Sequence, residues 1–273
     1  MSLTRAEVDH YEREGWIAPI DVMSEVEASD LAAELEKAEA AHPADLNPQH
    51  RNNAHLAFPF LAEVVTRRAI VSAVNSLVGD DVALWSTVLF IKEPDSSAFV
   101  SWHQDAFYMG LEPQNFVTAW LALTPSTYES GCVSVIPRSH RRSLEHTDTF
   151  GSDNILTRGQ EVAEIDTRQA VHLELRPGQM SLHHPWLVHG SQPNRSAERR
   201  VGVAMQSFLG GDVRPARGEH HVLHISGRSV HPSFVVVQPP TETASDRGIA
   251  TRRAANDAMA AVLYDGATKQ REL

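Results

Sequence analysis

Apolar positions along the chain follow a helical period before residue 80 and a different period after it. Capping boxes at 4–7 (Thr-Arg-Ala-Glu) and 24–27 (Ser-Glu-Val-Glu) predict two helices, of which the first ends near Gly15 and the second before His42. A third apolar stretch with helical spacing covers residues 62–79. The N-terminal part is therefore expected to supply helices that pack on the outside of the protein.

From residue 82 onward the apolar residues occur in short runs that are typical of β-strands. The runs are VALWSTVLFIKE, VSWHQDAFYM, NFVTAWLALT, CVSVIP, AVHLEL, QMSLHH, WLVHG and RRVGVAMQSF. Turn-forming Pro, Gly, Asn and Ser residues separate them. Many short strands with this spacing predict a mainly β fold with flanking helices, arranged as a sandwich or a barrel.

These changes of pattern divide the chain into parts of one domain that spans residues 1–273. Residues 1–80 are expected to form a mostly helical flank, and residues 82–240 the β core. Residues 138–170 lack strong periodicity, which predicts a long insertion of the kind that often covers an active site. Residues 241–273 are expected to form a polar tail with a helix around RRAANDAMAAVLY.

Composition and charge narrow the possible partners and the location. The formal net charge of −11 and the lack of a dense Lys/Arg run argue against nucleic acid. The first residues are charged where a signal peptide is apolar, and no apolar stretch approaches the roughly 20 residues of a membrane span. Cys132 is the only cysteine, which excludes an intramolecular disulfide. We therefore expect a cytoplasmic monomer or homodimer that makes no contact with a membrane.

Candidate chemistry begins with WHQD at 102–105, which holds His103 and Asp105 two positions apart. Alternate residues of a strand point the same way, so this pair can supply two ligands of a 2-His-1-carboxylate iron site. The same spacing occurs at His10/Glu12, His146/Asp148 and His172/Glu174. The first of these pairs lies in a helical pattern, the second is expected to be solvated in the polar insertion, and the third is expected on the solvent face of a strand. Only His103 and Asp105 have Trp102, Phe107 and Tyr108 around them and a β-rich segment before them.

A third ligand is expected among the histidines late in the β region, which are His183, His184 and His189. The first two are adjacent, so their side chains point to opposite faces of a strand and only one of them can line a pocket. His189 ends the run WLVH and precedes a turn. Downstream, Arg200 has the planar geometry that suits the far carboxylate of an α-keto diacid. Arg199 is its competitor, because the two residues point to opposite faces.

The blocks WHQD, VTAWLALTPSTYESGCVSVIPRSH and HGSQPNRSAERRVG, in this order, resemble the phytanoyl-CoA dioxygenase family of iron(II)/2-oxoglutarate oxygenases. The resemblance extends from LTRAEVDHYEREGWI through most of the β region. It implies a double-stranded β-helix core (a cupin-like jelly-roll) and the cofactors iron(II), 2-oxoglutarate and O2. It also implies hydroxylation of an unactivated C–H bond of a small or medium-sized metabolite, with release of succinate and CO2.

By this resemblance the iron ligands, and with them the catalytic centre, are His103, Asp105 and His189. The positions that match 2-oxoglutarate contacts in the family are Arg200, Ser191, Trp120 and Lys92. Halogenating relatives replace the carboxylate with a small residue, and the presence of Asp105 therefore implies a hydroxylase. The family block IPGSH reads IPRSH here, so that Arg138 replaces a glycine.

Candidate substrate contacts lie close to these motifs, with residues 138–170 as the expected lid. They are Gln104, Phe107, Tyr108, Met109, Ser134, Arg138 and His184. No residue separates hydroxylation from desaturation, epoxidation, epimerisation or cyclisation by the same machinery. Two other classes compete: a cupin-type metalloenzyme without 2-oxoglutarate, and a non-catalytic binding module. Arg200 with Ser191 argues against the first class, and the intact ligand set argues against the second.

Overall fold

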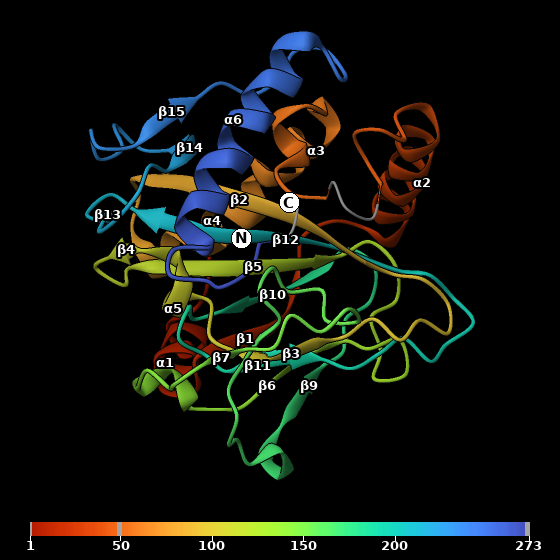
Figure 1. Ribbon diagram of the computed structural model, residues 1–273, viewed down its shortest axis with the longest axis vertical. Coiled ribbons are helices and arrows are strands. Elements are labelled where there is room, and N and C mark those ends of the chain that lie inside the picture. Colours follow the sequence, from red (N-terminus) through yellow and green to blue (C-terminus); the bar gives the residue numbers. More distant parts are fainter. Residues whose placement is uncertain (1, 48–50, 271–273) are drawn as a thin grey trace.

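The computed structural model describes residues 2–47 and 51–270, and most of its strands belong to two facing sheets (Figure 1). The larger sheet has the strand order β1 (Trp16–Asp21), β10 (Gln179–His183), β5 (Phe116–Ala122), β12 (Arg200–Gly210), β2 (Val82–Lys92), β14 (His221–Ser226) and β15 (Val235–Val237). The smaller sheet has the order β3 (Val100–His103), β11 (His189–Ser191), β6 (Val133–Val135) and β9 (Val171–Leu173). Two short pairs join β13 (Arg214–Pro215) to β4 (Leu111–Glu112) and β7 (Thr147–Asp148) to β8 (Gln160–Glu161). The predicted mainly β fold with flanking helices is confirmed.

The first two helices begin and end where the sequence predicts. In α1 (Arg5–Glu14) the Thr4 hydroxyl accepts a hydrogen bond from the Glu7 backbone N–H, and the Glu7 carboxylate accepts one from the Thr4 N–H at 2.6 Å. These bonds satisfy amide groups that have no partner inside the helix. The helix ends at Gly15, whose φ of +88° favours glycine. The second helix, α2 (Glu25–Ala41), opens with the same kind of box.

The single helix predicted over 62–79 is wrong, because the chain forms two helices there, α3 (Pro59–Val65) and α4 (Arg68–Val78). The Thr66 hydroxyl donates to the carbonyl oxygen of Ala62 at 3.0 Å, so that a side chain competes with the backbone donors of a continuing helix. A second difference is β1, which the pattern of apolar residues did not indicate. It pairs with β10 at the edge of the larger sheet.

Strand alternation sorts the side chains of the larger sheet between its two buried faces. On β5, Val117, Ala119 and Leu121 belong to the core that includes α3 and α4, whereas Thr118 and Trp120 point toward the smaller sheet. The helix side is built from apolar residues, whose burial drives folding. The space between the two sheets also contains polar side chains, and the candidate site lies there.

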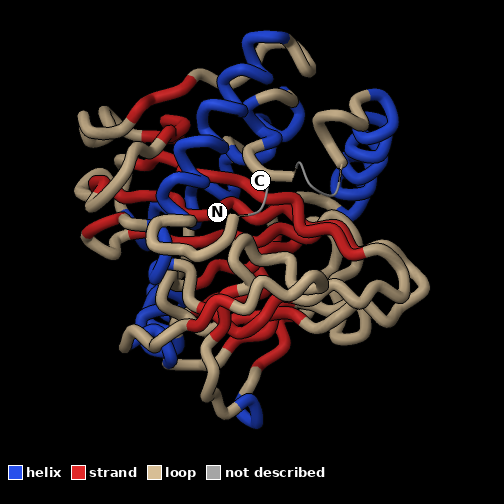
Figure 2. Tube along the Cα trace, in the orientation of Figure 1, coloured by secondary structure: helices blue, strands red, loops and turns tan. Residues whose placement is uncertain are grey.

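The remaining helices are α5 (Ala106–Met109), α6 (Asp246–Leu263) and the 3₁₀ turns η1 (Ala54–Leu56), η2 (Ser139–Arg141) and η3 (Thr167–Gln169). The predicted insertion consists mostly of loops and is held against the end of α6 (Figures 1 and 2). Within it, Arg158 pairs with Asp148 and donates to the carbonyl oxygens of Leu263 and Asp265 at 3.0 and 3.1 Å. None of the helices in the described ranges has the length and apolar character needed to cross a lipid bilayer.

Candidate active site

The three predicted ligands converge between the two sheets. His103 ends β3, His189 begins β11, and the two are register partners in the smaller sheet. Oδ1 of Asp105 lies 3.2 Å from Nε2 of His103 and 3.8 Å from Nε2 of His189. All three side chains are buried, and one donor atom of each lies within 4.8 Å of the other two. The cluster has the composition of a 2-His-1-carboxylate metal site.

The predicted reason for the approach of His103 and Asp105 is wrong, because they do not share an extended strand. β3 ends at His103, and Asp105 has helical dihedral angles (φ −58°, ψ −48°) at the start of α5. Gln104, between them, is anchored by hydrogen bonds from its Nε2 to the carbonyl oxygens of Arg142 and Trp186, at 2.9 and 2.6 Å. A fixed turn, rather than strand alternation, brings the carboxylate beside the imidazole.

Backbone contacts set the protonation of the two imidazoles. Nδ1 of His103 lies 2.9 Å from the carbonyl oxygen of Ser101, and Nδ1 of His189 lies 3.0 Å from that of Leu187. A carbonyl oxygen only accepts, so each Nδ1 carries the hydrogen and each Nε2 presents its lone pair. Burial lowers the pKa of His189 well below its ordinary value. The Thr118 hydroxyl donates a hydrogen bond to Oδ2 of Asp105 at 3.1 Å, which favours the ionised form of this carboxylate. A neutral imidazole and an ionised carboxylate are the forms that bind metal.

Two buried basic side chains lie beside the cluster. Arg200 and Lys92 are register partners on β12 and β2, and they are 1% and 0% exposed. The Arg200 guanidinium lies 5.1 Å from the centroid of the Trp120 ring, and its Nε and Nη2 have no hydrogen-bond partner among the described residues. Nζ of Lys92 donates to the Ser191 hydroxyl and to the Gln192 carbonyl oxygen. A buried guanidinium with two unpartnered nitrogens, next to an amine that can take up a proton, fits an anionic ligand.

Gly202 makes room for the aromatic ring beside Arg200. A Cβ atom at position 202 would lie 2.0 Å from the Trp120 indole, which is far inside contact distance. Any larger residue at this position would therefore displace Trp120 from the guanidinium.

Arg199, the alternative to Arg200, points to the opposite face of β12. Its guanidinium pairs with Glu39 of α2 at 2.9 Å and with Glu93 at 3.0 Å. Arg200 instead lines the narrow cavity that contains the three predicted ligands. Because successive side chains of a strand point to opposite faces, Arg199 and Arg200 lie on different sides of the sheet.

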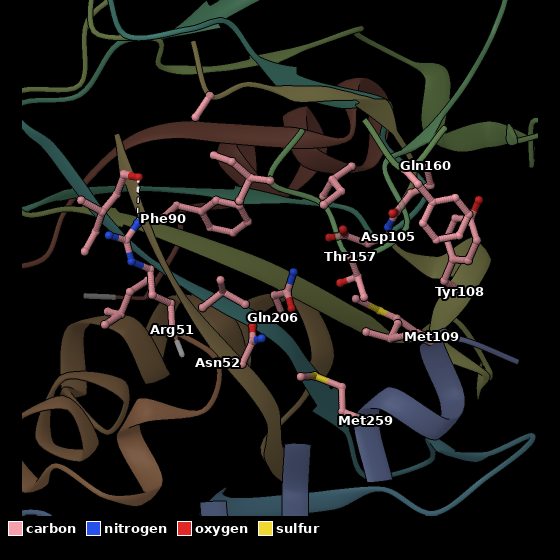
Figure 3. Close-up of a pocket in the computed structure, with 18 of the residues that line it drawn as sticks. Arg51, Asn52, Phe90, Asp105, Tyr108, Met109, Thr157, Gln160, Gln206 and Met259 are labelled. Carbon is pink, nitrogen blue, oxygen red and sulfur yellow. Dashed lines mark hydrogen bonds between the residues drawn. The ribbon is translucent and has the colours of Figure 1, made fainter. Parts of the chain in front are cut away.

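A second, larger cavity of about 790 Å³ adjoins the cluster and shares Phe90, Asp105 and Gln206 with the narrow one. Figure 3 shows Tyr108 and Met109 on its wall near Asp105. These two are the predicted substrate residues that line the cavity. Burial raises the pKa of Tyr108, so its hydroxyl stays protonated and lies 3.3 Å from Oδ1 of Asp148.

The structure places the other five predicted substrate residues elsewhere, which corrects the prediction for Gln104, Phe107, Ser134, Arg138 and His184. Phe107 is 39% exposed, and its ring lies 4.4 Å from that of His146. Ser134 points away from the space between the sheets, and its hydroxyl lies 2.8 Å from Nδ1 of His172. His184 packs against His140, with ring centroids 5.1 Å apart. Proximity in sequence to a ligand did not ensure proximity to the cavity.

Arg138 forms a two-pronged ion pair with Glu14 of α1. Its Nε and Nη2 lie 2.9 and 3.1 Å from the two carboxylate oxygens. Its φ of +67° is a left-handed conformation, which favours glycine.

We expect Arg138→Ala to leave catalytic turnover unchanged and to lower the melting temperature by a few degrees. The variant loses the contact with Glu14 and keeps the unfavourable φ. Arg138→Gly should melt above Arg138→Ala, within about 3 °C of the parent protein, because glycine adopts this φ without strain. Differential scanning calorimetry measures the order. A large loss of turnover in either variant would show that Arg138 contacts the substrate after all.

His146 is not solvated, contrary to the prediction. It is half-buried, its Nε2 accepts a hydrogen bond from the Gln104 backbone N–H at 2.9 Å, and burial lowers its pKa to about 4. It thus helps to hold the insertion over the turn that carries Asp105. His172 and Glu174 are exposed, as predicted for the solvent face of their strand.

Two residues of the site were not identified from the sequence. His183 is 2% exposed, and its Nε2 lies 3.8 Å from Oδ2 of Asp105. Thr118, its register partner on β5, donates a hydrogen bond from its hydroxyl to the same oxygen at 3.1 Å. The alternation of side chains along a strand indicated that His183 and His184 point to opposite faces of the sheet. It did not indicate which of the two faces holds the site.

Comparison with known proteins agrees with this geometry. The family model "Phytanoyl-CoA dioxygenase (PhyH)" matches residues 11–202. A probable alpha-ketoglutarate-dependent hypophosphite dioxygenase of Stutzerimonas stutzeri is 27% identical over 215 residues, which cover 74% of each protein. Peroxisomal phytanoyl-CoA dioxygenase of Bos taurus is 32% identical over 143 residues, covering 50% of this chain and 42% of the bovine protein. The solved structure of the apo non-heme monooxygenase ThoJ has a TM-score of 0.84 at 28% identity and covers 94% of this chain and 97% of its own.

A 2-His-1-carboxylate cluster on a double-stranded β-helix, next to buried basic side chains, defines a non-haem iron(II) dioxygenase that uses 2-oxoglutarate. The chain belongs to the phytanoyl-CoA dioxygenase (PhyH) family. The predicted family, enzyme class and cofactors are confirmed.

Proposed function

We propose that this dioxygenase hydroxylates an unactivated C–H bond of a small or medium-sized metabolite, with release of succinate and CO2. We also propose that His103, Asp105 and His189 are the iron ligands. The observation that carries the proposal is the convergence of these three buried donors beside a narrow cavity whose far wall is Arg200. Two imidazoles with free Nε2 atoms and an ionised carboxylate occupy one side of the metal and leave the other positions for cosubstrate and oxygen.

Four further residues are assigned to 2-oxoglutarate. Arg200 and Ser191 would hold its far carboxylate, Lys92 would orient the Ser191 hydroxyl, and Trp120 would pack against the guanidinium. Bound iron, cosubstrate and O2 supply the oxidising chemistry. The protein positions the reactants and excludes water from the space between the sheets.

Two rival classes are less consistent with these contacts. A cupin-type metalloenzyme without 2-oxoglutarate has no need of Arg200 and Lys92 buried beside the ligands, and a binding module has no need of three intact ligands. Desaturation, epoxidation, epimerisation and cyclisation would use the same protein residues, so product analysis distinguishes them from hydroxylation.

Anaerobic titration tests the assignment. Iron(II) added to the apoprotein, followed by 2-oxoglutarate, should produce a weak visible charge-transfer band that excess chelator removes. Oxygenated samples should then release succinate when a metabolite library is screened. A protein that shows neither the band nor succinate would contradict the proposal.

Lys92 should give the protein a characteristic pH dependence of stability. Burial, and after it the positive charge of Arg200, lower the pKa of Lys92 from 10.5 to about 6. Between pH 6 and pH 10.5 the Lys92 amine is protonated in the unfolded chain but not in the folded protein. The free energy of unfolding therefore rises with pH, by up to about 1.4 kcal/mol per pH unit. In urea unfolding, the free-energy difference between the parent protein and Lys92→Met should therefore grow in favour of the parent as the pH rises from about 6.5 to about 9.

Binding of the cosubstrate should weaken this dependence, because a carboxylate next to Lys92 raises its pKa. The same unfolding series with iron(II) and saturating 2-oxoglutarate measures the change. Parallel stability curves for the parent protein and Lys92→Met without ligand would show that Lys92 stays protonated in the folded state.

The remaining expectations belong to the same proposal: a single domain over residues 1–273, a cytoplasmic monomer or homodimer, and no nucleic-acid partner. The net charge of −11 and the single cysteine support a reducing compartment and a small-molecule substrate.

A further inference from the structure

The large cavity has a size that restricts the substrate. Its volume of about 790 Å³ lies toward the upper end of the range for small-molecule sites. A water molecule occupies about 30 Å³ in the liquid, so the cavity equals the volume of about 25 waters. A hypophosphite or methylphosphonate ion would fill only a small part of this space and would leave its apolar walls facing water.

The walls of the cavity are partly apolar and partly polar. Val88 and Phe90 of β2, Ile155 and Leu156 of the insertion, and Met259 of α6 line it from different sides. Gln206 lies between these walls in Figure 3, and its carboxamide makes no hydrogen bond to another described residue. Such a surface favours a ligand that has an apolar body and also carries polar groups.

Arg51 provides the charge at the end remote from Asp105 (Figure 3). Its Nη1 donates to the carbonyl oxygen of Ile91 at 3.0 Å, while its Nε is buried and has no partner among the described residues. No carboxylate lies within ion-pair distance of Arg51 in the described part of the chain; Glu39 and Glu93 act on its charge from farther away and are themselves paired with Arg199. Arg51 is also the sole cation among the described residues that line the cavity, so the cavity does not fit a polyanion such as a coenzyme A thioester.

We propose that the substrate is a medium-sized metabolite with an apolar portion and one carboxylate or similar monoanionic group, which Arg51 binds while the reacting carbon lies beside Asp105. This inference rests on the proposed function, because it places the reaction at the same cluster. Guanidinium–carboxylate bonds are charge-assisted and two-pronged, so one such bond orients the long axis of the ligand.

Isothermal titration of the anaerobic enzyme, loaded with iron(II) and 2-oxoglutarate, tests this with decanoate, decan-1-ol and hypophosphite as probes. Decanoate should bind at least about tenfold more tightly than decan-1-ol, and hypophosphite should not compete with it. Arg51→Met should remove the preference for decanoate, whereas Arg51→Lys should keep part of it. Met259→Trp should weaken both chain-like probes by filling the cavity. Arg68→Met, at an exposed position on α4, is the matched control and should change nothing.

Three results would overturn the substrate class. The parent enzyme could bind decanoate and decan-1-ol equally well, Arg51→Met could keep the preference for decanoate, or hypophosphite could bind tightly in the cavity. The charge-transfer band is recorded on the same anaerobic samples, and succinate release is recorded after they are exposed to air. If they are normal while the probes fail, only the substrate class is wrong. If the probes bind as expected without either signal, the proposed function is wrong and the cavity specificity remains.

A separate observation concerns His183. It is buried beside the cluster, its ring lies 4.5 Å from that of His189, and neither ring nitrogen has a hydrogen-bond partner among the described residues. Together with Thr118 it lies near Oδ2 of Asp105, whereas His103 and His189 lie near Oδ1. We infer that His183 is a positioning residue that holds Oδ2, so that Asp105 offers a single oxygen, Oδ1, to the metal.

Iron(II) affinity of the apoprotein, measured anaerobically without 2-oxoglutarate, tests this role independently of activity. His183→Phe and Thr118→Val should each weaken iron binding by about 10–100-fold, the usual effect of losing a partner that orients a metal ligand. His183→Gln should restore part of the affinity through its amide donor. His184→Phe, next along the chain but outside the site, should bind iron normally. An unchanged affinity and charge-transfer band in His183→Phe would overturn the inference.

Discussion

Replacing His189 with alanine should lower iron-dependent succinate formation by more than about 100-fold. Loss of a residue that merely orients a ligand costs about 10–100-fold, so loss of the ligand itself should exceed that range. His189 offers a free Nε2 because its Nδ1 donates to the Leu187 carbonyl oxygen. His103→Ala should have the same effect from the neighbouring strand, since the two residues face each other in the smaller sheet.

The measurement combines anaerobic iron(II) binding with succinate release in air. His172→Ala is the matched control, because this histidine is exposed on β9 and remote from the narrow cavity. It should retain parental iron affinity and turnover. If His103→Ala and His189→Ala both kept iron-dependent turnover, the assignment of the metal centre would be refuted.

Replacing Arg200 with methionine should raise the KM for 2-oxoglutarate by about 30–150-fold, the equivalent of 2–3 kcal/mol for a lost charge-assisted contact. The guanidinium is 1% exposed and has two nitrogens without partners among the described residues, so a carboxylate ligand would complete its hydrogen bonds. The turnover number at saturating cosubstrate should fall much less than the KM rises, because the contact is present before and during the reaction.

Arg199→Met is the control for this prediction. Arg199 lies one position earlier and carries the same charge, but its partners are Glu39 and Glu93 on the opposite face of β12. Its replacement should change the KM for 2-oxoglutarate by less than about twofold, as expected for a remote surface pair. Steady-state kinetics with varied 2-oxoglutarate separates the two variants. A larger effect at Arg199 would place the cosubstrate on the other face.

Short sequence motifs correctly predicted those helices whose ends are stabilised by hydrogen bonds between neighbouring residues. The boxes at Thr4 and Ser24 predicted α1 and α2 with their ends, because capping bonds join residues three positions apart. The same approach failed over residues 62–79, where the apolar pattern continues but the Thr66 hydroxyl bonds to the backbone and ends α3. It also missed β1, whose only strand partner is β10, about 160 residues further along the chain.

The candidate site divides in a similar way. The residue types of the cluster were evident from the sequence, and the resemblance to the PhyH family selected His103, Asp105 and His189 among several pairs. The geometry behind them was not evident, because a turn anchored by Gln104 replaces the expected strand. Nor was the cavity, whose walls come from β2, the insertion and α6.

The sequence alone determined the class of the protein, since strand patterns, helix caps and the order of three motifs are properties of neighbouring residues. Only the tertiary structure decided which member of each adjacent pair faces the site, Arg200 rather than Arg199 and His183 rather than His184. The physical reason is that a strand sends successive side chains to opposite faces, while the layer that covers each face is built from distant parts of the chain.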